Sequence, residues 1–361
     1  MTHALALALR GTGHVSPNPR VGCVIVADNI VLAEGWHAEY GGPHAEAHAL
    51  ASLFARPEYS DSTSMHTLPE NAIVYVTLEP CSHVGKRGSC ADALLAAGAR
   101  HVVIGMVDPY PEVNGRGIQR LHDNGVIVDV GICQDACAWT NRSFVKYVTT
   151  GTPYVVLKMA QTLDGFVAPP DRSRMAITGV ESRTRVHALR AEFDAVLIGI
   201  GTALADDPEL TVRDVDGRNP VRVVMDRRCL LPITSRLVQT AHSIRTLVAC
   251  NAEYALINAQ WIIDVEAHGI DVIQLDNTET FDSLFAALAE RGIASVFCEG
   301  GARLAAALMG QHCVDELHVH VASSTMGVGH RWTPDEASAW QLHTCERVGG
   351  DVHLLLLPTS S

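Results

Sequence analysis

The first half of the chain contains residues of the types that bind zinc and move protons. His44 and Glu46 form a His-x-Glu pair, Cys81 follows a Glu-Pro dipeptide, and Cys90 comes nine positions later. A catalytic zinc site uses three protein ligands and leaves the fourth position to water. Zinc deaminases combine His-x-Glu with Pro-Cys and a second cysteine, and their glutamate handles protons without binding the metal. The pattern therefore predicts Zn2+ bound by His44, Cys81 and Cys90, with Glu46 as general base and then general acid.

Short elements must hold these four residues close together. The expected elements are a helix over 44–54, a strand over 72–78 and a short helix over 90–97. Residues two apart on a regular helix point in different directions. His44 and Glu46 can therefore reach the same site only if the helix begins at His44. The dipole of the helix that starts at Cys90 would stabilise its thiolate, as a metal ligand requires. Bound zinc would lower the pKa of its water toward about 7 and supply hydroxide at neutral pH.

Strand-like and helix-like segments alternate along the whole chain, which predicts sheets covered by helices. In the first half we expect strands at 21–26, 72–78, 101–107 and 126–130, and a further helix near 117–123. A second series follows Gly151-Thr152-Pro153, with strands at 154–159, 195–199, 221–226, 246–250, 295–298, 316–321 and 352–357 and helices at 181–193 and 302–309. The 361 residues are therefore expected to form two α/β domains, 1–148 and 149–361.

Composition narrows the class of protein. A net charge of -13 argues against a protein that grips a nucleic-acid backbone, so a small diffusible substrate is expected. The N-terminus has no basic leader and is predicted to be an amphipathic helix, and no apolar stretch is long enough to span a membrane. Ten cysteines spread over the chain do not suggest a disulfide framework. The expected location is a reducing cytoplasm.

The cysteine spacing also distinguishes this chain from nucleic-acid and cytidine deaminases, which usually have Cys-x-x-Cys. The segment 80–90, Pro-Cys-Ser-His-Val-Gly-Lys-Arg-Gly-Ser-Cys, resembles the deaminase half of the bifunctional riboflavin-biosynthesis deaminase/reductase family (RibD/RibG). Further resemblance lies in 18–26, 35–37, 42–46, 108–109 and 115–118. The loop between the cysteines departs from the family, because Lys86-Arg87-Gly88-Ser89 stands where Arg-Thr-Pro-Pro is usual.

This resemblance implies a substrate that the residues alone do not identify. Spacing predicts only the deamination of an amino-heterocycle, whereas the family deaminates 2,5-diamino-6-ribosylamino-4(3H)-pyrimidinone 5′-phosphate at C2. Asn18 and His37 are candidates for contacts with this substrate. A turn asparagine and a packed histidine are equally good interpretations of these two residues.

The second half resembles the reductase half of the same family, which has a dihydrofolate-reductase-like fold. Residues 158–165, Lys-Met-Ala-Gln-Thr-Leu-Asp-Gly, and the block 199–213 carry the resemblance. Gly199-x-Gly201 is not a dinucleotide fingerprint, because Leu204 stands at the third glycine position. Gly300 and Gly301 follow a strand and precede a helix, where backbone N–H groups suit a cofactor phosphate, although an ordinary tight turn would have the same sequence.

The resemblance assigns roles in this half by position. It implies an N-terminal cytidine-deaminase-like α/β/α domain followed by a dihydrofolate-reductase-like α/β domain that uses NADPH. The implied cofactor residues are Ala160, Ala176, Thr202, Asp206, Gly300, Gly301, Ala302, Arg303 and Leu304. The implied substrate residues are Arg174, Arg190, Leu210, Arg213 and Glu299, and the implied catalytic residues are Lys158 and Asp164. Solvated arginines and a structural Lys158–Asp164 pair are the plainer alternatives.

Departures from the family pattern leave a second hypothesis open. Phe166 replaces the family's arginine, Ala176 replaces its tryptophan, and residues 322–327 lack the usual Pro-Lys. The leading hypothesis is a deaminase that also reduces the ribosyl group to ribityl with NADPH. The alternatives are a deaminase joined to a module that binds a phosphorylated ligand without hydride transfer, and a nucleic-acid or cytidine deaminase with an unrelated appendage. The resemblance also suggests a homo-oligomer formed through the reductase half.

Overall fold

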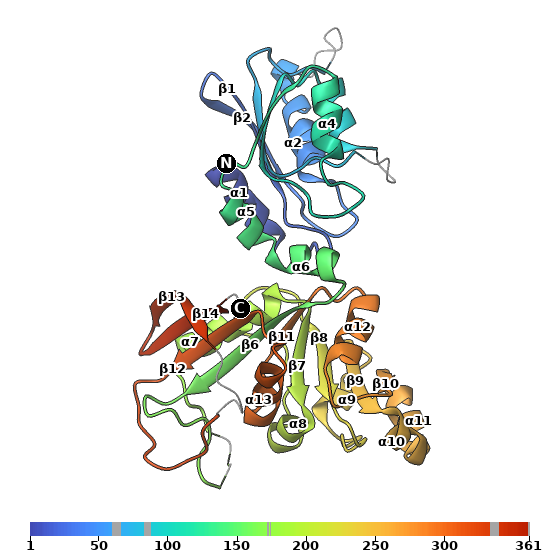
Figure 1. The fold of residues 1–361 in the computed structure, drawn as a ribbon, viewed down its shortest axis with the longest axis vertical. Coiled ribbons are helices and arrows are strands. Elements are labelled where there is room, and N and C mark those ends of the chain that lie inside the picture. The colour runs from blue at the N-terminus through green and yellow to red at the C-terminus, as the bar shows by residue number, and fades with distance from the viewer. Residues whose placement is uncertain (60–65, 83–87, 172, 174, 333–338, 360–361) are drawn as a thin grey trace. The chain divides into compact units, whose positions relative to one another are not determined.

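The chain divides into two units, Met1–Gly151 and Thr152–Ser361, and each has its own sheet and apolar core (Figure 1). The computed structural model describes residues 1–59, 66–82, 88–171, 173, 175–332 and 339–359. The boundary expected at residue 148 lies within α6 (Arg142–Thr150), the last helix of the first unit. None of the helices formed by these residues combines the length and the apolar character needed to cross a bilayer.

The first unit is built on a five-stranded sheet. Its strands are β1 (Gly22–Ala27), β2 (Ile30–Trp36), β3 (Ile73–Leu78), β4 (His101–Met106) and β5 (Ile127–Val130). They lie in the order β2-β1-β3-β4-β5, and β1 is antiparallel to both of its neighbours while β3, β4 and β5 are parallel. The carboxyl ends of β3 and β4 therefore lie at the same edge of the sheet.

Helices cover both faces of this sheet, because the strands bury apolar side chains on both sides. One face packs against α2 (Ala45–Phe54), α3 (Cys90–Ala96) and α4 (Arg116–Asp123). The other face packs against α1 (Thr2–Ala8) and α5 (Gln134–Thr140). This is the α/β/α arrangement expected for the first half.

The second unit is built on a nine-stranded sheet. Its strands are β6 (Tyr154–Gln161), β7 (Ala195–Gly199), β8 (Val221–Met225), β9 (Thr246–Asn251), β10 (Ile270–Leu275), β11 (Ser295–Cys298), β12 (Glu316–Val321), β13 (Trp340–Val348) and β14 (Asp351–Pro358). Their order is β10-β9-β8-β7-β11-β6-β12-β14-β13. All neighbours are parallel except at one end, where β14 is antiparallel to β12 and to β13.

Two apolar clusters fill the two faces of the larger sheet. One cluster includes residues of α12 (Asp282–Glu290) and α13 (Ala302–Gly310). The other includes residues of α7 (Val180–Glu192), α9 (Arg236–Gln239) and α11 (Ala259–Ala267). The short helices α8 (Ile200–Asp206) and α10 (Ala252–Ile257) follow β7 and β9 directly. In an open parallel sheet, ligands bind beyond the carboxyl ends of the strands, and α8 and α13 begin at such ends.

Candidate metal centre and ligand-binding cavity

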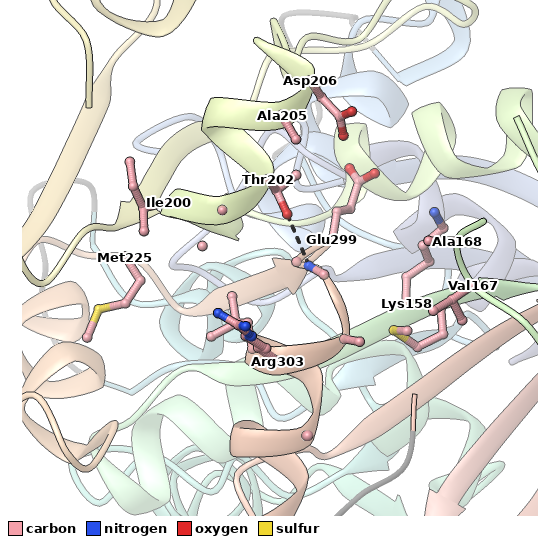
Figure 2. A pocket seen from close by; sticks show the side chains of 18 of the residues that line it. Lys158, Val167, Ala168, Ile200, Thr202, Ala205, Asp206, Met225, Glu299 and Arg303 are labelled. Carbon is pink, nitrogen blue, oxygen red and sulfur yellow. Dashed lines mark hydrogen bonds between the residues drawn. The ribbon is translucent and has the colours of Figure 1, made fainter. Parts of the chain in front are cut away.

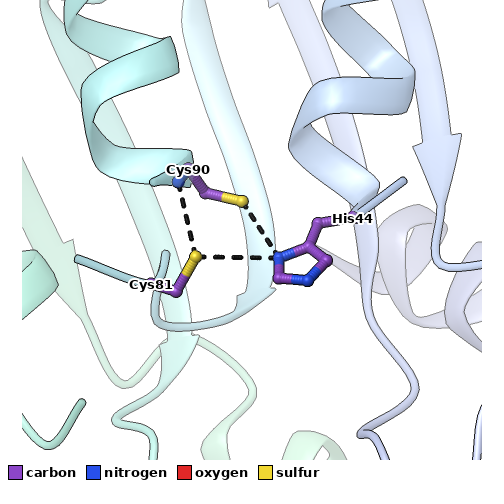
Figure 3. A group of neighbouring side chains, drawn as sticks. All are labelled: His44, Cys81 and Cys90. Atoms are coloured by element: carbon purple, nitrogen blue, oxygen red, sulfur yellow. Dashed lines mark hydrogen bonds between the residues drawn. The ribbon is translucent and has the colours of Figure 1, made fainter. Parts of the chain in front are cut away.

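The three predicted metal ligands meet at one edge of the first sheet (Figure 3). The Nδ1 atom of His44 lies 3.2 Å from the Sγ atom of Cys90 and 3.7 Å from that of Cys81. The ligand atoms of all three residues lie within 4.8 Å of one another. The sequence prediction that these residues converge is thus confirmed.

Each ligand is placed by the start or end of an element. His44 is the N-cap residue of α2, and its backbone is extended, which turns the side chain away from the helix. Cys90 is the first residue of α3, where the Ser89 hydroxyl caps the helix by accepting from the N–H of Asp92 at 3.1 Å. Cys81 follows β3, and its sulfur accepts from the N–H of Cys90 at 3.4 Å. These contacts fix the three ligands before any metal binds.

The donor set fits zinc. One imidazole nitrogen and two thiolate sulfurs form the three-ligand set of a catalytic zinc, which leaves a fourth position for water. The hydrogen bond from Cys90 and the neighbouring His44 lower the pKa of the Cys81 thiol to about 4. The hydrogen bond to Cys81 together with burial raises the pKa of the Cys90 thiol. Binding of a divalent cation favours the thiolate form of both cysteines and would release their protons.

Glu46 lies beside the three ligands, one residue into α2. Its side chain is only 3% exposed. Burial raises the pKa of Glu46 to about 7, the Cys81 charge adds to this effect, and His44 opposes it. A nearby divalent cation would favour the carboxylate and pull this pKa down again. A carboxyl group that titrates near neutral pH is suited to take up a proton and return it.

Asn18 and His37, predicted to contact substrate, are joined to the ligand His44 through the backbone. The Nδ1 atom of His37 lies 2.9 Å from the carbonyl oxygen of Pro43, and the Asn18 amide lies 3.3 Å from the Nε2 atom of His37. The rings of His37 and His44 meet edge to face, with centroids 5.5 Å apart. Burial lowers the pKa of His37, so the neutral tautomer with Nδ1–H donating to Pro43 is favoured. The pair therefore fixes the turn that leads into His44.

Glu79 is a functional residue of this site that the sequence analysis missed. Its buried carboxylate accepts from the backbone N–H groups of Asp108 (3.2 Å), Gly115 (2.9 Å), Gly117 (2.8 Å) and Ile118 (3.3 Å). A Cβ atom at Gly117 would lie 1.9 Å from the carbonyl oxygen of Pro80, so only glycine allows this approach. Glu79 thereby holds the segment before α4 against the backbone that carries Cys81. An acidic residue at the end of an apolar strand was the available signal.

The second unit contains a large cavity at the carboxyl ends of its strands. Its volume is about 1670 Å³, above the roughly 300–1000 Å³ of a pocket for one drug-sized ligand. It therefore has room for a dinucleotide and a second small molecule together. Of the predicted residues it is lined by Lys158, Ala160, Ala176, Arg190, Thr202, Asp206, Arg213, Glu299, Gly300, Gly301, Ala302, Arg303 and Leu304.

One end of the cavity has the features of a phosphate-binding site. The Thr202 hydroxyl accepts from the N–H of Gly301 at 3.2 Å, and this bond joins the starts of α8 and α13 (Figure 2). A Cβ atom at Gly300 would come within 2.6 Å of the Leu304 side chain, which would have to move to make room where the chain turns into α13. Arg228 and Arg303 also line the cavity. A helix N-terminus and two arginines suit the phosphates of a dinucleotide.

Charged side chains also line the cavity beside this turn. Arg190 of α7 binds both carboxylate oxygens of Glu299, and its Nη1 atom donates to the Thr211 carbonyl at 2.9 Å. Burial opposes ionisation of Glu299, but Arg190 and Lys158 hold its pKa below the usual value. Burial lowers the pKa of Lys158, with Glu299 opposing and Arg190 adding to the shift. Lys158 can therefore change its charge more readily than an exposed lysine.

Three predicted residues of this half are not found among the described residues that line the cavity. Asp164 does not line the described cavity, because its carboxylate accepts from the Thr162 hydroxyl at 2.5 Å and from the N–H groups of Met326 and Gly327. These bonds, with Thr162 first, lower its pKa to about 2. Leu210 is 3% exposed and packs in the apolar cluster beneath α7. Arg174 lies outside the described residues.

Phe166, which replaces the family's arginine, lies beside another arginine in the structure. The guanidinium of Arg331 lies over the Phe166 ring, 4.4 Å from its centroid, and Arg331 lines the cavity. The two segments are joined by backbone bonds between Val167 and His330 and between His330 and Ala168, each of 2.8 Å. A cationic side chain thus faces the cavity from position 331 although position 166 is aromatic.

Both units match known protein families. Residues 1–106 match the cytidine and deoxycytidylate deaminase zinc-binding region, and residues 153–354 match the RibD C-terminal domain. These matches confirm the predicted fold class and the zinc-binding region.

Full-length relatives cover nearly the whole chain. The chain is 35% identical to riboflavin biosynthesis protein RibD of Actinobacillus pleuropneumoniae over 98% of this chain and 93% of that protein. It is 36% identical to the Escherichia coli RibD over 91% of this chain and 88% of that protein. A solved diaminohydroxyphosphoribosylaminopyrimidine deaminase/5-amino-6-(5-phosphoribosylamino)uracil reductase from Thermotoga maritima superposes with a TM-score of 0.86 at 31% identity, covering 99% of this chain and 97% of that one. Acinetobacter baumannii RibD does so with a TM-score of 0.86 at 33% identity, covering 99% and 98%.

Proposed function

Since this chain belongs to the RibD family of riboflavin-biosynthesis deaminase/reductases, we propose that its two units catalyse two successive steps on one phosphorylated pyrimidine. The first step is hydrolytic deamination of 2,5-diamino-6-ribosylamino-4(3H)-pyrimidinone 5′-phosphate at C2. The second is reduction of the ribosyl group of the deaminated product to ribityl. The observation that carries the proposal is the convergence of His44, Cys81 and Cys90 beside the buried Glu46.

In the first unit, the protein positions the metal and moves protons. Zinc, when bound by His44, Cys81 and Cys90, supplies the acidified water that attacks the amino-bearing carbon. Glu46 takes a proton from that water and gives one to the departing ammonia. Its burial supports this role, because a carboxyl with a raised pKa can hold the proton between the two events. Asn18 and His37 would orient the pyrimidine beside His44.

In the second unit, the protein binds and orients two ligands. The reduced nicotinamide supplies hydride when NADPH is bound. Thr202, Asp206 and residues 300–304 would hold NADPH, with its phosphates at the start of α13, and Ala160 and Ala176 would border its nicotinamide. The substrate would lie against Arg190, Glu299 and Lys158, and Arg213 would bind its phosphate. Lys158 would hold and deliver a proton at the ribosyl group.

Two residues have narrower proposed roles. Asp164 would act by tying residues 326–327 to the wall of the cavity through its hydrogen bonds, and so would support Lys158 without reaching it. Leu210 would shape the substrate end from below, since it is buried under α7. Arg174 keeps its predicted contact with substrate, and a homo-oligomer formed through this unit and a cytoplasmic location stay predictions.

Variants that affect one reaction at a time test the proposal. Purified zinc-loaded protein is given the diaminopyrimidine phosphate, and ammonia release and NADPH oxidation are followed separately. Glu46→Gln should stop ammonia release yet still oxidise NADPH when the deaminated intermediate is added. Lys158→Met should do the reverse. Unimpaired ammonia release by Glu46→Gln would overturn the deaminase assignment, and unimpaired NADPH oxidation by Lys158→Met would overturn the role of Lys158.

A further inference from the structure

A row of ionisable side chains is buried on one face of the larger sheet. Leu317 and Val319 of β12 pack in the cluster with α12 and α13, so the alternating Glu316, His318 and His320 point to the opposite face, the one that packs against α7. Their side chains are 0%, 2% and 0% exposed. His318 pairs in register with Lys158 of the neighbouring strand β6, so the row begins beside a residue of the cavity. Alternating polar residues on a strand usually face water, so their burial calls for an explanation.

Most of this row forms a continuous hydrogen-bonded chain, which we call the histidine chain. Its links are Tyr154 to Glu316 (3.0 Å), Glu316 to His318 (2.6 Å), His318 to His353 (2.9 Å) and His353 to Glu346 (3.0 Å). Glu346 lies on the edge strand β13 with its side chain 48% exposed, and it also binds Arg185 of α7 at 3.3 Å. The histidine chain therefore runs from the interior of the sheet to solvent.

His320 is the member of the row that this chain leaves out. Both of its ring nitrogens are buried, and neither has a hydrogen-bond partner among the residues the structure describes. His320 lies directly opposite His353 in the β12–β14 pairing, with ring centroids 4.7 Å apart, and beside Ala160 of β6. A buried polar group without a partner is unfavourable, so an apolar residue would be more stable at this position.

The His320 imidazole lies among charged and titratable groups from several elements. Lys158 acts on it from β6, His318 from β12, His353 from β14 and Arg185 from α7, and Glu346 of β13 lies behind His353, to which it is hydrogen-bonded. Burial, followed by the charges of His353, Lys158, His318 and Arg185, lowers the pKa of His320 to about 3. His320 is therefore a neutral imidazole that can accept a proton on one nitrogen and donate from the other.

The proposed reduction requires a proton as well as a hydride. Hydride addition at C1′ breaks the C1′–O4′ bond, and O4′ leaves as a hydroxyl after taking a proton. Each turnover thus consumes one proton, and NADPH and substrate bound together in the cavity would restrict access of water to Lys158. A route for protons through the protein would remove this restriction.

We propose that His320 is a positioning residue that passes protons from the histidine chain to Lys158. The inference rests on the proposed function of Lys158 as the proton donor to O4′. After Lys158 has given up its proton, an N–H bond of His320 breaks and an N–H bond forms on the lysine. The other ring nitrogen takes a proton from His353, which regains one through Glu346 from solvent. A turn of the ring, or an intervening water, closes the gaps on either side of His320.

A matched pair of variants tests this link. His320→Leu removes the link, and His268→Leu is the control, since the His268 ring does not line the cavity and its Nδ1 atom bonds to the Asp264 carbonyl. We expect His320→Leu to lower the kcat for NADPH oxidation at least about tenfold, below the full effect of losing a general acid. NADPH affinity and ammonia release should stay unchanged. Added imidazole should partly restore turnover in His320→Ala.

A second readout does not depend on activity. Nitrogen-15 NMR of the His320 ring reports its tautomer and the hydrogen bonds of each nitrogen. The ring signals should shift when Lys158 is replaced by methionine and stay in place in the His268→Leu control. Full turnover in His320→Leu, or His320 ring signals that stay unchanged in Lys158→Met, would overturn the inference. Absence of reductase turnover in the wild-type protein would instead contradict the proposed function itself.

Discussion

Replacing Glu79 by glutamine should loosen the segment at the start of α4 and lower the affinity for zinc, although no metal ligand is changed. The buried carboxylate accepts four backbone N–H groups, two on each oxygen. Glutamine has nearly the same shape, but it turns one oxygen into an NH2 group that cannot accept. Two of the four buried donors then lose their partner. Because Pro80 and Cys81 follow directly, the loosened segment should also lower the affinity for zinc.

The expected magnitude follows from the geometry. One of the two lost bonds is short, 2.8 or 2.9 Å, and the other is long, 3.2 or 3.3 Å. A buried donor left without a partner costs about 1–3 kcal/mol, so the pair should cost roughly 2–4 kcal/mol. At about 1.4 kcal/mol per factor of ten, amide protection over 108–118 should fall roughly 30- to 700-fold.

Native-state hydrogen exchange measures this local free energy directly. The matched control is Glu70→Gln, which removes a carboxylate from the same unit that is 82% exposed and bound to Arg100 at the surface. The control should change protection by less than a factor of about three, since exposed ion pairs contribute little. Equal protection of 108–118 in Glu79→Gln and Glu70→Gln would refute the role given to Glu79.

Further predictions concern the metal, the cofactor and pH. Cys90→Ala should lose most of the bound zinc measured by metal analysis, whereas Cys133→Ala, at an exposed cysteine of the same unit, should keep it; equal zinc in both would exclude Cys90 as a ligand. Ala176→Trp should tighten NADPH binding about fivefold, because stacking on an aromatic ring contributes ~1 kcal/mol, and an unchanged dissociation constant would show that Ala176 does not border the nicotinamide. The pKa of His320 is about 3 in the folded protein, against an ordinary value of 6.5. Between these two pH values the unfolded chain binds a proton that the folded protein does not, so the free energy of unfolding falls as the pH drops from 6.5 toward 3. His320→Leu should remove this part of the acid sensitivity in urea titrations, by up to ~1.4 kcal/mol per pH unit, and an unchanged pH dependence would contradict the depressed pKa.

Much of the fold was predictable because the central strands are buried on both faces. Their sequences are therefore continuous runs of apolar, often β-branched residues. β3, β7, β11 and β12 begin within a residue of their predicted positions. β13 was not predicted, because it is an exposed edge strand with a polar sequence that gains its partner only from β14. The strands β2 and β10 and the helix α8 were also missed, the last because it contains Gly201, which disfavours helix on propensity.

The metal ligands were predictable because they belong to two short sequence motifs whose residue types and spacing are typical of zinc deaminases. His44 and Glu46 are neighbours at a helix start, and Cys81 and Cys90 flank one loop. An acidic residue at the end of an apolar strand singles out Glu79, but not its role, because its partners lie some 30 to 40 positions away and are backbone groups without a sequence signature. His318 and His320 were missed for another reason. Their alternation along β12 is typical of a solvent-facing strand, yet in the folded unit they are 2% and 0% exposed and pack against His353 of β14.

The most direct test of two linked reactions is a metal-removal experiment with product analysis. The zinc-loaded protein, the diaminopyrimidine phosphate and saturating NADPH are incubated together, and ammonia, NADPH and products are followed by absorbance and mass spectrometry. We expect one NADPH oxidised per ammonia released, with the ribityl product formed. Protein stripped of zinc should release no ammonia from the diamino substrate but should still oxidise NADPH with the deaminated intermediate. Bound NADPH that is never oxidised in the presence of that intermediate would contradict the account and favour a second unit that only binds its ligand.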